Sequence, residues 1–276
     1  MLVLAVETST PQSSVCLATE HGTVASATLN PPPRSAGRGR PGGHAEFLAP
    51  AIAFCLRSAE LPMAAVAGIA VGLGPGLYTG MRVGIATAQT LAHARGLPTV
   101  GLASLDLLAF EVRHVRRLVC AAVDARRGEL FWAFYRHAPG GMLRVTEFRL
   151  GPAAKLAGEI EAVREDVLCV GDGAIAERAL LESTGAEIGW AANAHPSAEA
   201  LAQLSIARFV REDTQRAEEL HPLYLRKADA KINWRARGAL HGGPGDRTAA
   251  HEEHKARQAP VEAAADPAPG PRPGED

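Results

Sequence analysis

The sequence predicts an α/β protein in which the second half repeats the order of elements of the first. Short apolar runs typical of strands alternate with segments in which apolar residues recur at helical spacing. In each half, three strands are followed by a helix, a strand and another helix. The first strand of each half ends in an acidic residue, Glu7 in one half and Asp124 in the other. This repetition predicts a duplicated fold of two lobes with a cleft between them.

Composition limits the classes of function. With 276 residues and 47% hydrophobic content, the chain can form a sizeable core. The formal net charge of −1 gives no overall attraction to nucleic acid, so an RNA contact would be local or made through a partner. The four cysteines lie singly within apolar runs, which predicts reduced core residues. No signal peptide or membrane-spanning run is recognisable, which predicts a cytoplasmic protein.

Residues 1–112 are expected to form the N-terminal lobe. Strands are predicted over residues 2–6, 14–19, 23–29, 66–73 and 98–101, with the second and third forming a hairpin. Helices are predicted over residues 44–59, from residue 78 onward, and over 104–112, the last of them capped by Ser104. Residues 30–43, rich in Pro, Gly and Arg, are predicted to form a loop.

Residues 113–233 are expected to form the C-terminal lobe. Its predicted strands cover residues 118–123, 130–135, 143–150 and 167–170. Its helices cover residues 152–163, a segment opened by Gly171-Asp172-Gly173, and a segment capped by Ser197 that runs to residue 211. Residues 234–276 contain only Leu240 and Val261 as large aliphatic residues, which predicts a disordered tail.

The stretch Gly72–Gly84 joins a predicted buried strand to a predicted helix and is rich in glycine. Gly74 and Gly76 flank Pro75, so backbone N–H groups could converge on an anion at the start of the helix. Alternatively, the glycines let strand and helix pack closely, and the residues of the loop alone favour this interpretation. A Walker-type phosphate loop is excluded, because it needs a second glycine followed by lysine where Thr79 stands.

A stripe of small residues follows along one face of that helix. Gly80, Gly84, Ala88 and Ala92 recur every four residues. Each glycine inside a helix costs about 1 kcal/mol relative to alanine, so a close contact is expected to compensate. That contact could be with the helix of a partner or with the sheet of the same chain.

Four motifs, in their order and spacing, are similar to those of a known family. They are Ala5–Thr10, Gly74–Gly84, Asp124–Glu129 and Pro222–Arg226. Over residues 1–226 the chain resembles the bacterial TsaB (YeaZ-like) family of tRNA threonylcarbamoyladenosine biosynthesis proteins. The resemblance implies a duplicated actin-like ATPase fold (ASKHA, ribonuclease H-like). It also implies a function in forming the N6-threonylcarbamoyl modification of adenosine 37 in tRNAs that read codons beginning with A.

The same resemblance implies an accessory role without catalysis. A member of the family dimerises with a catalytic threonylcarbamoyl transferase paralogue (TsaD) and activates it, and a small ATPase (TsaE) completes the complex. A homodimer is implied when the paralogue is absent, and tRNA is contacted mainly through the complex. The first two helices form the implied dimer surface, to which six residues are assigned here: His44, Leu48, Gly80, Arg82, Gly84 and Ala88.

The resemblance also provides a test for metal and nucleotide sites. The paralogue holds a metal ion with two histidines four residues apart on its first helix, whereas here His44 is followed by Leu48, so no metal site is expected. The turn Thr8-Ser9-Thr10 lacks the glycine that would let phosphates approach the backbone, which predicts a degenerate cleft without a cofactor. Binding of ATP or ADP at the interface of the complex stays open. The resemblance places nine residues of this chain where actin-like ATPases contact the nucleotide, and these would form the degenerate cleft: Glu7, Thr8, Ser9, Gly74, Gly76, Thr79, Asp124, Gly171 and Gly173.

Two alternatives to an accessory role are carried forward. The first is an active enzyme of this fold, a nucleotide hydrolase or a phosphoryl or acyl transferase that uses Glu7 and Asp124. The second is a simple RNA-binding protein, which would need a strongly basic face that the sequence does not show. The arginines of the predicted loop, Arg34, Arg38 and Arg40, have no assigned role.

Overall fold

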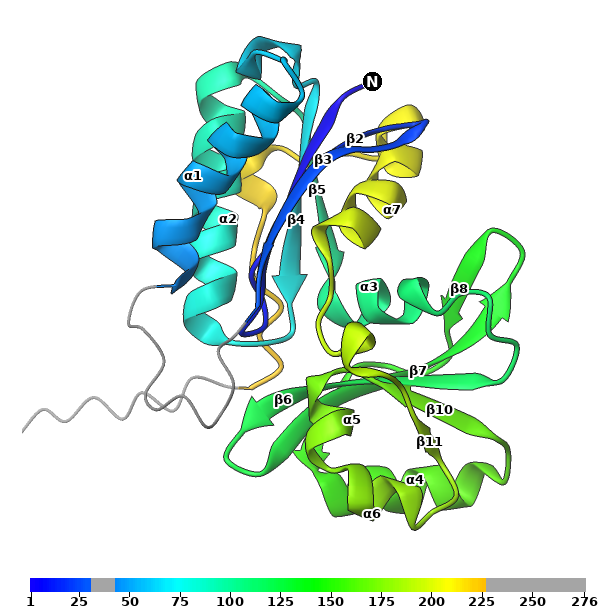
Figure 1. Cartoon of the computed structure of the whole chain (residues 1–276). Helices are drawn as coiled ribbons and strands as arrows, with labels where there is room; N and C mark the ends of the chain where they lie inside the picture. The colour runs from blue at the N-terminus through cyan, green and yellow to red at the C-terminus, as the bar shows by residue number, and fades with distance from the viewer. Residues whose placement is uncertain (31–42, 227–276) are drawn as a thin grey trace, which may run out of the picture. The chain divides into compact units, whose positions relative to one another are not determined.

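The computed structural model describes residues 1–30 and 43–226, which form two mixed β-sheets with helices on both faces of each (Figure 1). Most of the loop predicted at residues 30–43 and the whole tail predicted at 234–276 lie outside the described residues. Residues 1–227 cluster as one compact unit. The two predicted lobes are therefore parts of a single unit.

The first sheet consists of five strands in the order β3-β2-β1-β4-β5. β2 and β3 form the predicted hairpin, and β2 is antiparallel to β1. β4 is parallel to β1, and β5 is parallel to β4. The strands are β1 (Val3–Glu7), β2 (Ser13–Thr19), β3 (Gly22–Leu29), β4 (Gly68–Gly74) and β5 (Thr99–Ala103).

The second sheet repeats this arrangement. Its strands follow the order β8-β7-β6-β10-β11, with antiparallel pairs up to β6 and parallel pairs beyond it. The matching order and directions confirm the duplication predicted from the sequence. The strands are β6 (Leu118–Arg126), β7 (Glu129–Ala138), β8 (Gly141–Arg144), β9 (Arg149–Pro152), β10 (Val167–Val170) and β11 (Glu187–Ile188).

The prediction of one strand over residues 143–150 is wrong. The segment forms two short strands, and both pair with β7 at different places. β8 pairs with Tyr135–Ala138, whereas β9 pairs with Glu129–Trp132. Because an apolar run is the only signal available to the sequence, the break between the two short strands was not visible.

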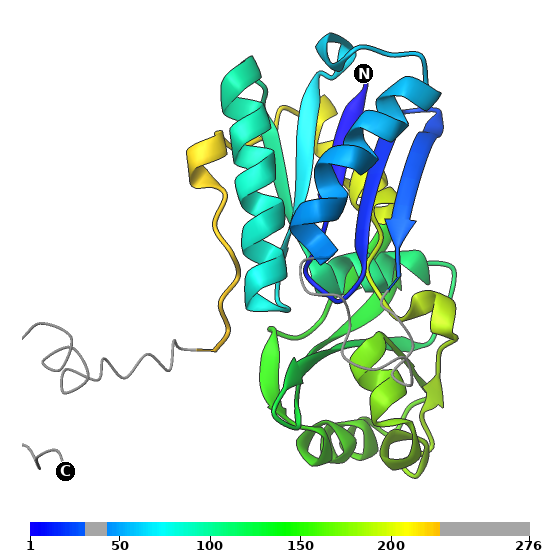
Figure 2. The ribbon, with the colours of Figure 1, turned by 60° about the vertical axis from the view of Figure 1, so that its left-hand side comes forward.

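The helices cover the sheets in a pattern that crosses between the halves (Figures 1 and 2). α1 (Gly43–Ser58) and α2 (Tyr78–Arg95) pack on one face of the first sheet, and α7 (Ala198–Val210) packs on the other. On the second sheet, α3 (Ser104–Glu111) packs opposite α4 (Ala153–Val163), α5 (Asp172–Ala176) and α6 (Arg178–Glu182). Each half of the sequence thus contributes a helix to the core of the other, which ties the lobes together.

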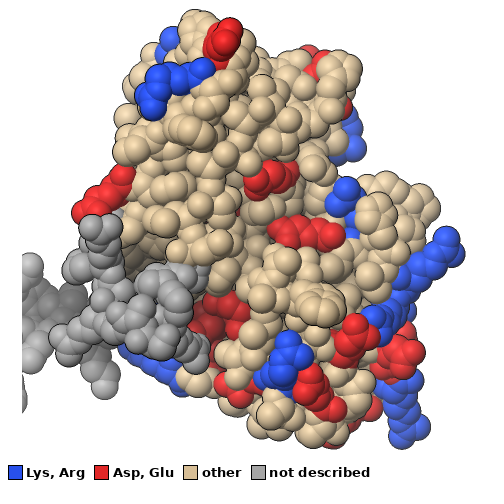
Figure 3. Space-filling view, viewed as in Figure 1, with Lys and Arg blue, Asp and Glu red and all other residues tan. Residues whose placement is uncertain are grey.

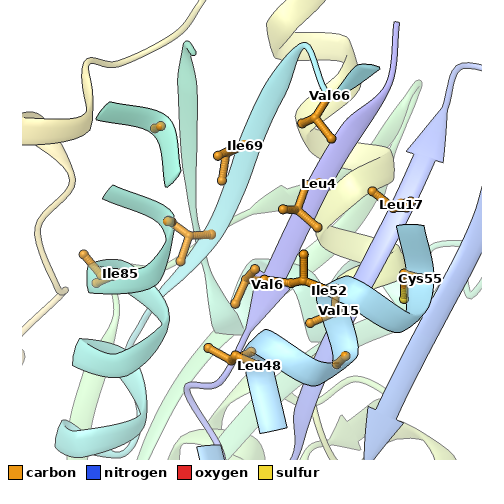
Figure 4. Close-up of a cluster of buried hydrophobic side chains, with 14 of the residues drawn as sticks. Leu4, Val6, Val15, Leu17, Leu48, Ile52, Cys55, Val66, Ile69 and Ile85 are labelled. Atoms are coloured by element: carbon orange, nitrogen blue, oxygen red, sulfur yellow. The ribbon is translucent and has the colours of Figure 1, made fainter. Parts of the chain in front are cut away.

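Alternation along β1 explains how the first sheet is buried on both faces. Leu4 and Val6 face α1 and α2, where they meet Leu48 and Ile85 (Figure 4). Val3 and Ala5 face α7. Full burial of a side chain such as that of Leu4 contributes about 1.5 to 3 kcal/mol to the free energy of unfolding. All four cysteines are buried and free, as predicted.

Two predicted helix caps have different outcomes. The Ser197 side chain accepts a hydrogen bond from the backbone N–H of Ala200 at 3.1 Å, which confirms the cap of α7. The predicted cap at Ser104 is wrong, because Ala103 occupies the capping position of α3. The Ser104 hydroxyl instead donates to the Ser9 hydroxyl at 2.6 Å in the buried interior. It therefore fastens α3 to the turn that follows β1.

The segment after α7 returns along the first sheet and ends on the second. Gln215 exchanges backbone hydrogen bonds with Thr99 in β5, and Leu220 is buried in the first core. The Leu223 N–H donates to the Leu73 carbonyl at 2.8 Å, and Arg226 forms an ion pair with Glu129. The motif Pro222–Arg226 therefore links the two sheets, and we call residues 213–226 the C-terminal strap.

Candidate functional site

Glu7 lies at the end of β1 with its carboxyl group enclosed by protein. Its side chain is 1% exposed, and Oε1 accepts a hydrogen bond from the Ser9 N–H at 2.6 Å. Oε2 makes no hydrogen bond within the described residues and lies where a side chain on Gly72 would stand. Burial raises the pKa of Glu7 to about 7, although hydrogen bonds from Ser9 lower it in part. A carboxylate held in this way cannot approach a metal-nucleotide without rearrangement of β4.

Stability should depend on pH through Glu7. Its pKa rises from 4.5 to about 7 on folding, so the folded state retains a proton that the unfolded state has lost between these pH values. The free energy of unfolding should then fall by about 3 kcal/mol as pH rises through this window. We expect Glu7→Gln to remove that part of the pH dependence and to be more stable than the wild type above pH 7.

Urea unfolding at pH 5 and pH 8 measures this effect. Glu161→Gln, the same change at an exposed position of α4, is the matched control and should keep the pH dependence of the wild type. An unchanged pH dependence in Glu7→Gln would show that its carboxyl group is not enclosed as described.

The glycine-rich loop after β4 packs directly on the turn after β1. The Leu77 N–H donates to the Ser9 carbonyl at 2.7 Å, and the Thr8 hydroxyl donates to the Gly80 carbonyl at 2.8 Å. A Cβ atom on Gly76 would overlap with the Ser9 carbonyl oxygen. The glycines of this loop therefore allow close packing on the turn after β1, which is the alternative interpretation to an anion site. Thr79 is exposed and takes no part in these contacts.

In the second lobe, the predicted cleft residues stabilise a turn of their own. The Asp124 carboxylate accepts hydrogen bonds from the Arg126 N–H at 2.7 Å and from the Arg126 guanidinium at 3.0 Å. Gly171 and Gly173 lie against the backbone of β6, where a Cβ on Gly171 would overlap with the Ala122 carbonyl oxygen. These contacts assign Gly171 and Gly173 to packing, whereas the Asp124 carboxylate orders the turn between β6 and β7.

The structure does not bring the predicted cleft residues into one site. Glu7 is enclosed against β4, whereas Asp124 opens into a polar pocket of about 330 Å³ that Glu7 does not line. Within the described residues, the predicted cleft residues therefore group around Glu7 and the turn after β1 on the one hand and around Asp124 on the other. The lining of the Asp124 pocket consists of Asp124, Arg126, Arg127, Gly128, Glu129, Leu130, Ala176 and Glu177.

His44 stands at the start of α1 and is held by a hydroxyl group. Its Nδ1 lies 2.7 Å from the Ser13 hydroxyl, and burial lowers the pKa of the imidazole. Leu48, at the position of the paralogue's second histidine, is buried in the first core. Among residues 1–30 and 43–226, no group of three His, Cys, Asp or Glu side chains is arranged to hold a metal ion. His44 thus connects α1 to β2.

The small-residue stripe, which the sequence analysis assigned to a partner interface, makes an internal contact in this structure. Gly80, Gly84 and Ala88 are buried against the first sheet and the turn after β1, and Leu48 of α1 is buried with them. A Cβ atom on Gly84 would overlap with the Thr8 hydroxyl. The small residues therefore let α2 approach its own sheet, which is the internal contact that the sequence left open.

The outward sides of α1 and α2 present a different surface. Neither Phe47–Leu56 of α1 nor Val83–Ala92 of α2 contains a charged residue, although both stretches include exposed positions. Ala86, Thr87, Thr90 and Leu91 line a shallow hollow of about 310 Å³ in α2. Figure 3 shows an uncharged expanse where α1 lies in Figure 1. We call these outward sides the α1–α2 surface. In the sequence, this surface could have been recognised from the absence of charged residues at exposed helical positions.

A second exposed feature lies at the start of α2. The Arg82 Nε–H donates to the Tyr224 hydroxyl at 2.9 Å, and the Arg82 guanidinium carbon lies 4.3 Å from the centre of the Tyr78 ring. The rings of Tyr78 and Tyr224 stack with their centres 5.6 Å apart. The sequence placed Arg82 in a partner interface but gave no role to either tyrosine. We call these three residues the Tyr-Arg-Tyr cluster.

No helix within the described residues is both long enough and apolar enough to cross a membrane.

Comparisons with known proteins agree with this architecture. Residues 40–234 match the family model described as TsaD: tRNA N6-adenosine threonylcarbamoyltransferase. The tRNA threonylcarbamoyladenosine biosynthesis protein TsaB of Bacillus subtilis is 30% identical over 199 residues, which cover 69% of this chain and 83% of that protein. TsaB of Escherichia coli is 29% identical over 229 residues, covering 82% of this chain and 95% of that protein.

A solved structure shares the fold. The crystal structure of a Pseudomonas aeruginosa protein with similarity to peptidase YEAZ has a TM-score of 0.69 and 29% identity, covering 82% of this chain and 99% of that chain. A second structure, YeaZ from P. aeruginosa, has a TM-score of 0.65 and 28% identity. With two matching sheets, interchanged helices and relatives that match over most of their length, the chain belongs to the TsaB (YeaZ-like) family of actin-like proteins.

Proposed function

We propose that this chain is the accessory, non-catalytic subunit of the complex that forms N6-threonylcarbamoyladenosine at position 37 of tRNAs reading codons beginning with A. Membership of the TsaB family assigns the chain to tRNA threonylcarbamoyladenosine biosynthesis. In this role it dimerises with the transferase paralogue TsaD and activates it, with TsaE as the third protein. The observation that carries the accessory role is the enclosure of Glu7 by the loop and strands around it.

The surroundings of the two candidate acids favour placing the chemistry in the partner, because Glu7 is enclosed and Asp124 is held in an ion pair. An actin-like enzyme needs an accessible carboxylate between its lobes for a metal-nucleotide. Here Glu7 packs against Gly72, and Asp124 is engaged by its neighbour Arg126. We therefore assign no cofactor to this chain and place any ATP or ADP at the interface of the complex.

The α1–α2 surface is the proposed site of pairing. An exposed helical surface without charge can be covered by apolar helices of a partner at little desolvation cost. Because this chain matches the family model of the transferase itself, the partner is expected to have the same fold and an equivalent pair of helices. Two such surfaces can pack face to face about a pseudo-twofold axis. A second copy of this chain can occupy the same surface when the transferase is absent, giving a homodimer.

The accessory role predicts that the two acids are dispensable for tRNA modification. We expect the double variant Glu7→Gln/Asp124→Asn to support threonylcarbamoyladenosine formation within about twofold of the wild type in a reaction reconstituted with TsaD, TsaE and tRNA. The matched control is Glu161→Gln/Asp166→Asn, which makes the same changes at exposed positions. If the double variant still pairs with the transferase but loses 100-fold or more in rate, about the effect of removing catalytic groups, the chain is an enzyme.

A further inference from the structure

We propose that the Tyr-Arg-Tyr cluster is a contact surface for single-stranded RNA, namely a loop of the tRNA substrate. The proposal rests on the proposed function, which requires tRNA to reach the complex. It assigns to Tyr78, Arg82 and Tyr224 a role different from that of the uncharged α1–α2 surface.

The cluster fixes the orientation of one guanidinium group. Arg82 lies over the Tyr78 ring and donates from Nε to the Tyr224 hydroxyl, so its plane is held by two contacts. Among the described residues no carboxylate forms an ion pair with Arg82, and the Arg82 residue is exposed. A guanidinium that is held at Nε presents its remaining donors in a planar fork suited to a phosphate group.

The aromatic rings beside it remain accessible. Tyr78 is 55% exposed and Tyr224 is 47% exposed, although the two rings stack on each other. The C-terminal strap does not need the ring of Tyr224 as an anchor, because Leu220 is buried and Leu223 is hydrogen-bonded to β4. Exposed aromatic rings next to an arginine are the means by which proteins stack and hold unpaired RNA bases.

The adjoining turn between β6 and β7 lies beside the cluster and has a strained backbone conformation. Arg126 and Arg127 both have left-handed backbone angles, with φ of 64° and 60°. Arg226, two residues after Tyr224, forms an ion pair with Glu129 in β7, which brings the turn close to the cluster. Left-handed non-glycine residues persist mainly where the surrounding structure or function requires them. The acids of the turn, Asp124 and Glu129, are already paired with arginines, so the charge of Arg82 is not neutralised by them.

The test compares two arginines of one helix in the complex with the transferase. Arg82→Ala removes the charge of the cluster, and Arg95→Ala makes the same change at the other end of α2, where Arg95 is exposed. Binding of tRNA is measured by fluorescence anisotropy at several salt concentrations. We expect Arg82→Ala to weaken binding about tenfold and to reduce the slope of log affinity against log salt by about one, whereas Arg95→Ala leaves both unchanged.

Two variants of Tyr78 test the role of the ring. Tyr78→Phe keeps the stacking face and is expected to bind tRNA like the wild type, whereas Tyr78→Ala is expected to weaken binding about tenfold. An unpaired RNA oligonucleotide should compete for the cluster better than a duplex of the same length.

Two results would overturn the proposal. One is an Arg82→Ala complex with the affinity and salt dependence of the wild type. The other is loss of pairing with the transferase in Arg82→Ala but not in Arg95→Ala, which would assign Arg82 to the protein interface. Failure of the wild-type chain to pair would instead contradict the proposed function, and the same variants would then be compared on the chain alone to judge the RNA surface.

Discussion

Ala86→Arg is expected to abolish pairing with the transferase and formation of threonylcarbamoyladenosine. Ala86 is exposed, lies within the uncharged stretch of α2 and lines the shallow hollow of the α1–α2 surface. In the proposed complex a guanidinium group at this position would be buried among uncharged side chains without a partner. Burial of an unpaired charge costs several kcal/mol, so we expect affinity to fall at least 100-fold. The free chain should be as stable as the wild type, because the new side chain is exposed there.

Pairing is measured by size-exclusion chromatography with light scattering, and stability by thermal unfolding of the free chain. Ala192→Arg places the same side chain at an exposed position in the short helical turn Ala191–Asn193 and serves as the control. If Ala86→Arg pairs with the transferase as tightly as Ala192→Arg does, the α1–α2 surface is not the interface.

Gly84→Ala is expected to lower the free energy of unfolding by about 2 to 4 kcal/mol. The added Cβ would overlap with the Thr8 hydroxyl, which donates a hydrogen bond to the Gly80 carbonyl. To relieve the overlap, α2 would have to shift away from the turn after β1. Gly158→Ala is the matched control, because Gly158 is exposed within α4 and no atom lies near the position of its Cβ. There alanine should stabilise the chain by about 1 kcal/mol through helix propensity.

Urea unfolding of the two variants separates internal packing from a partner contact. A lower free energy of unfolding for Gly84→Ala and a higher one for Gly158→Ala would support the packing described here. A Gly84→Ala variant that is as stable as the wild type but no longer pairs with the transferase would place the small-residue stripe in the interface instead.

The fold was predictable because its signals are local and repeated. The hairpin of β2 and β3, the helices α1, α2 and α4 and the strand β10 follow from apolar periodicity and turn residues. Repetition of these elements in the second half predicted the second sheet. The crossing of α3 and α7 between the two cores was not predictable, because it depends on contacts between residues far apart in the sequence.

The candidate site was predicted less completely. Helical spacing shows that Gly80, Gly84 and Ala88 share a face, but it does not show whether that face meets a sheet or a partner. Likewise, the acid at the end of β1 is visible in the sequence, whereas its enclosure by Gly72 arises from pairing of β1 with β4. The Tyr-Arg-Tyr cluster joins residues 142 positions apart, so no local pattern could have revealed it.

Titration of the transferase with this chain tests the accessory role most directly. The rate of threonylcarbamoyladenosine formation is followed at a fixed concentration of TsaD, with TsaE and tRNA in excess, while the concentration of the wild-type chain is raised. We predict no product from this chain without TsaD, and a rate that rises to a plateau when the chain and TsaD are present in the ratio of their complex. Product formed without TsaD, or a TsaD rate that does not respond to the chain, would contradict the account.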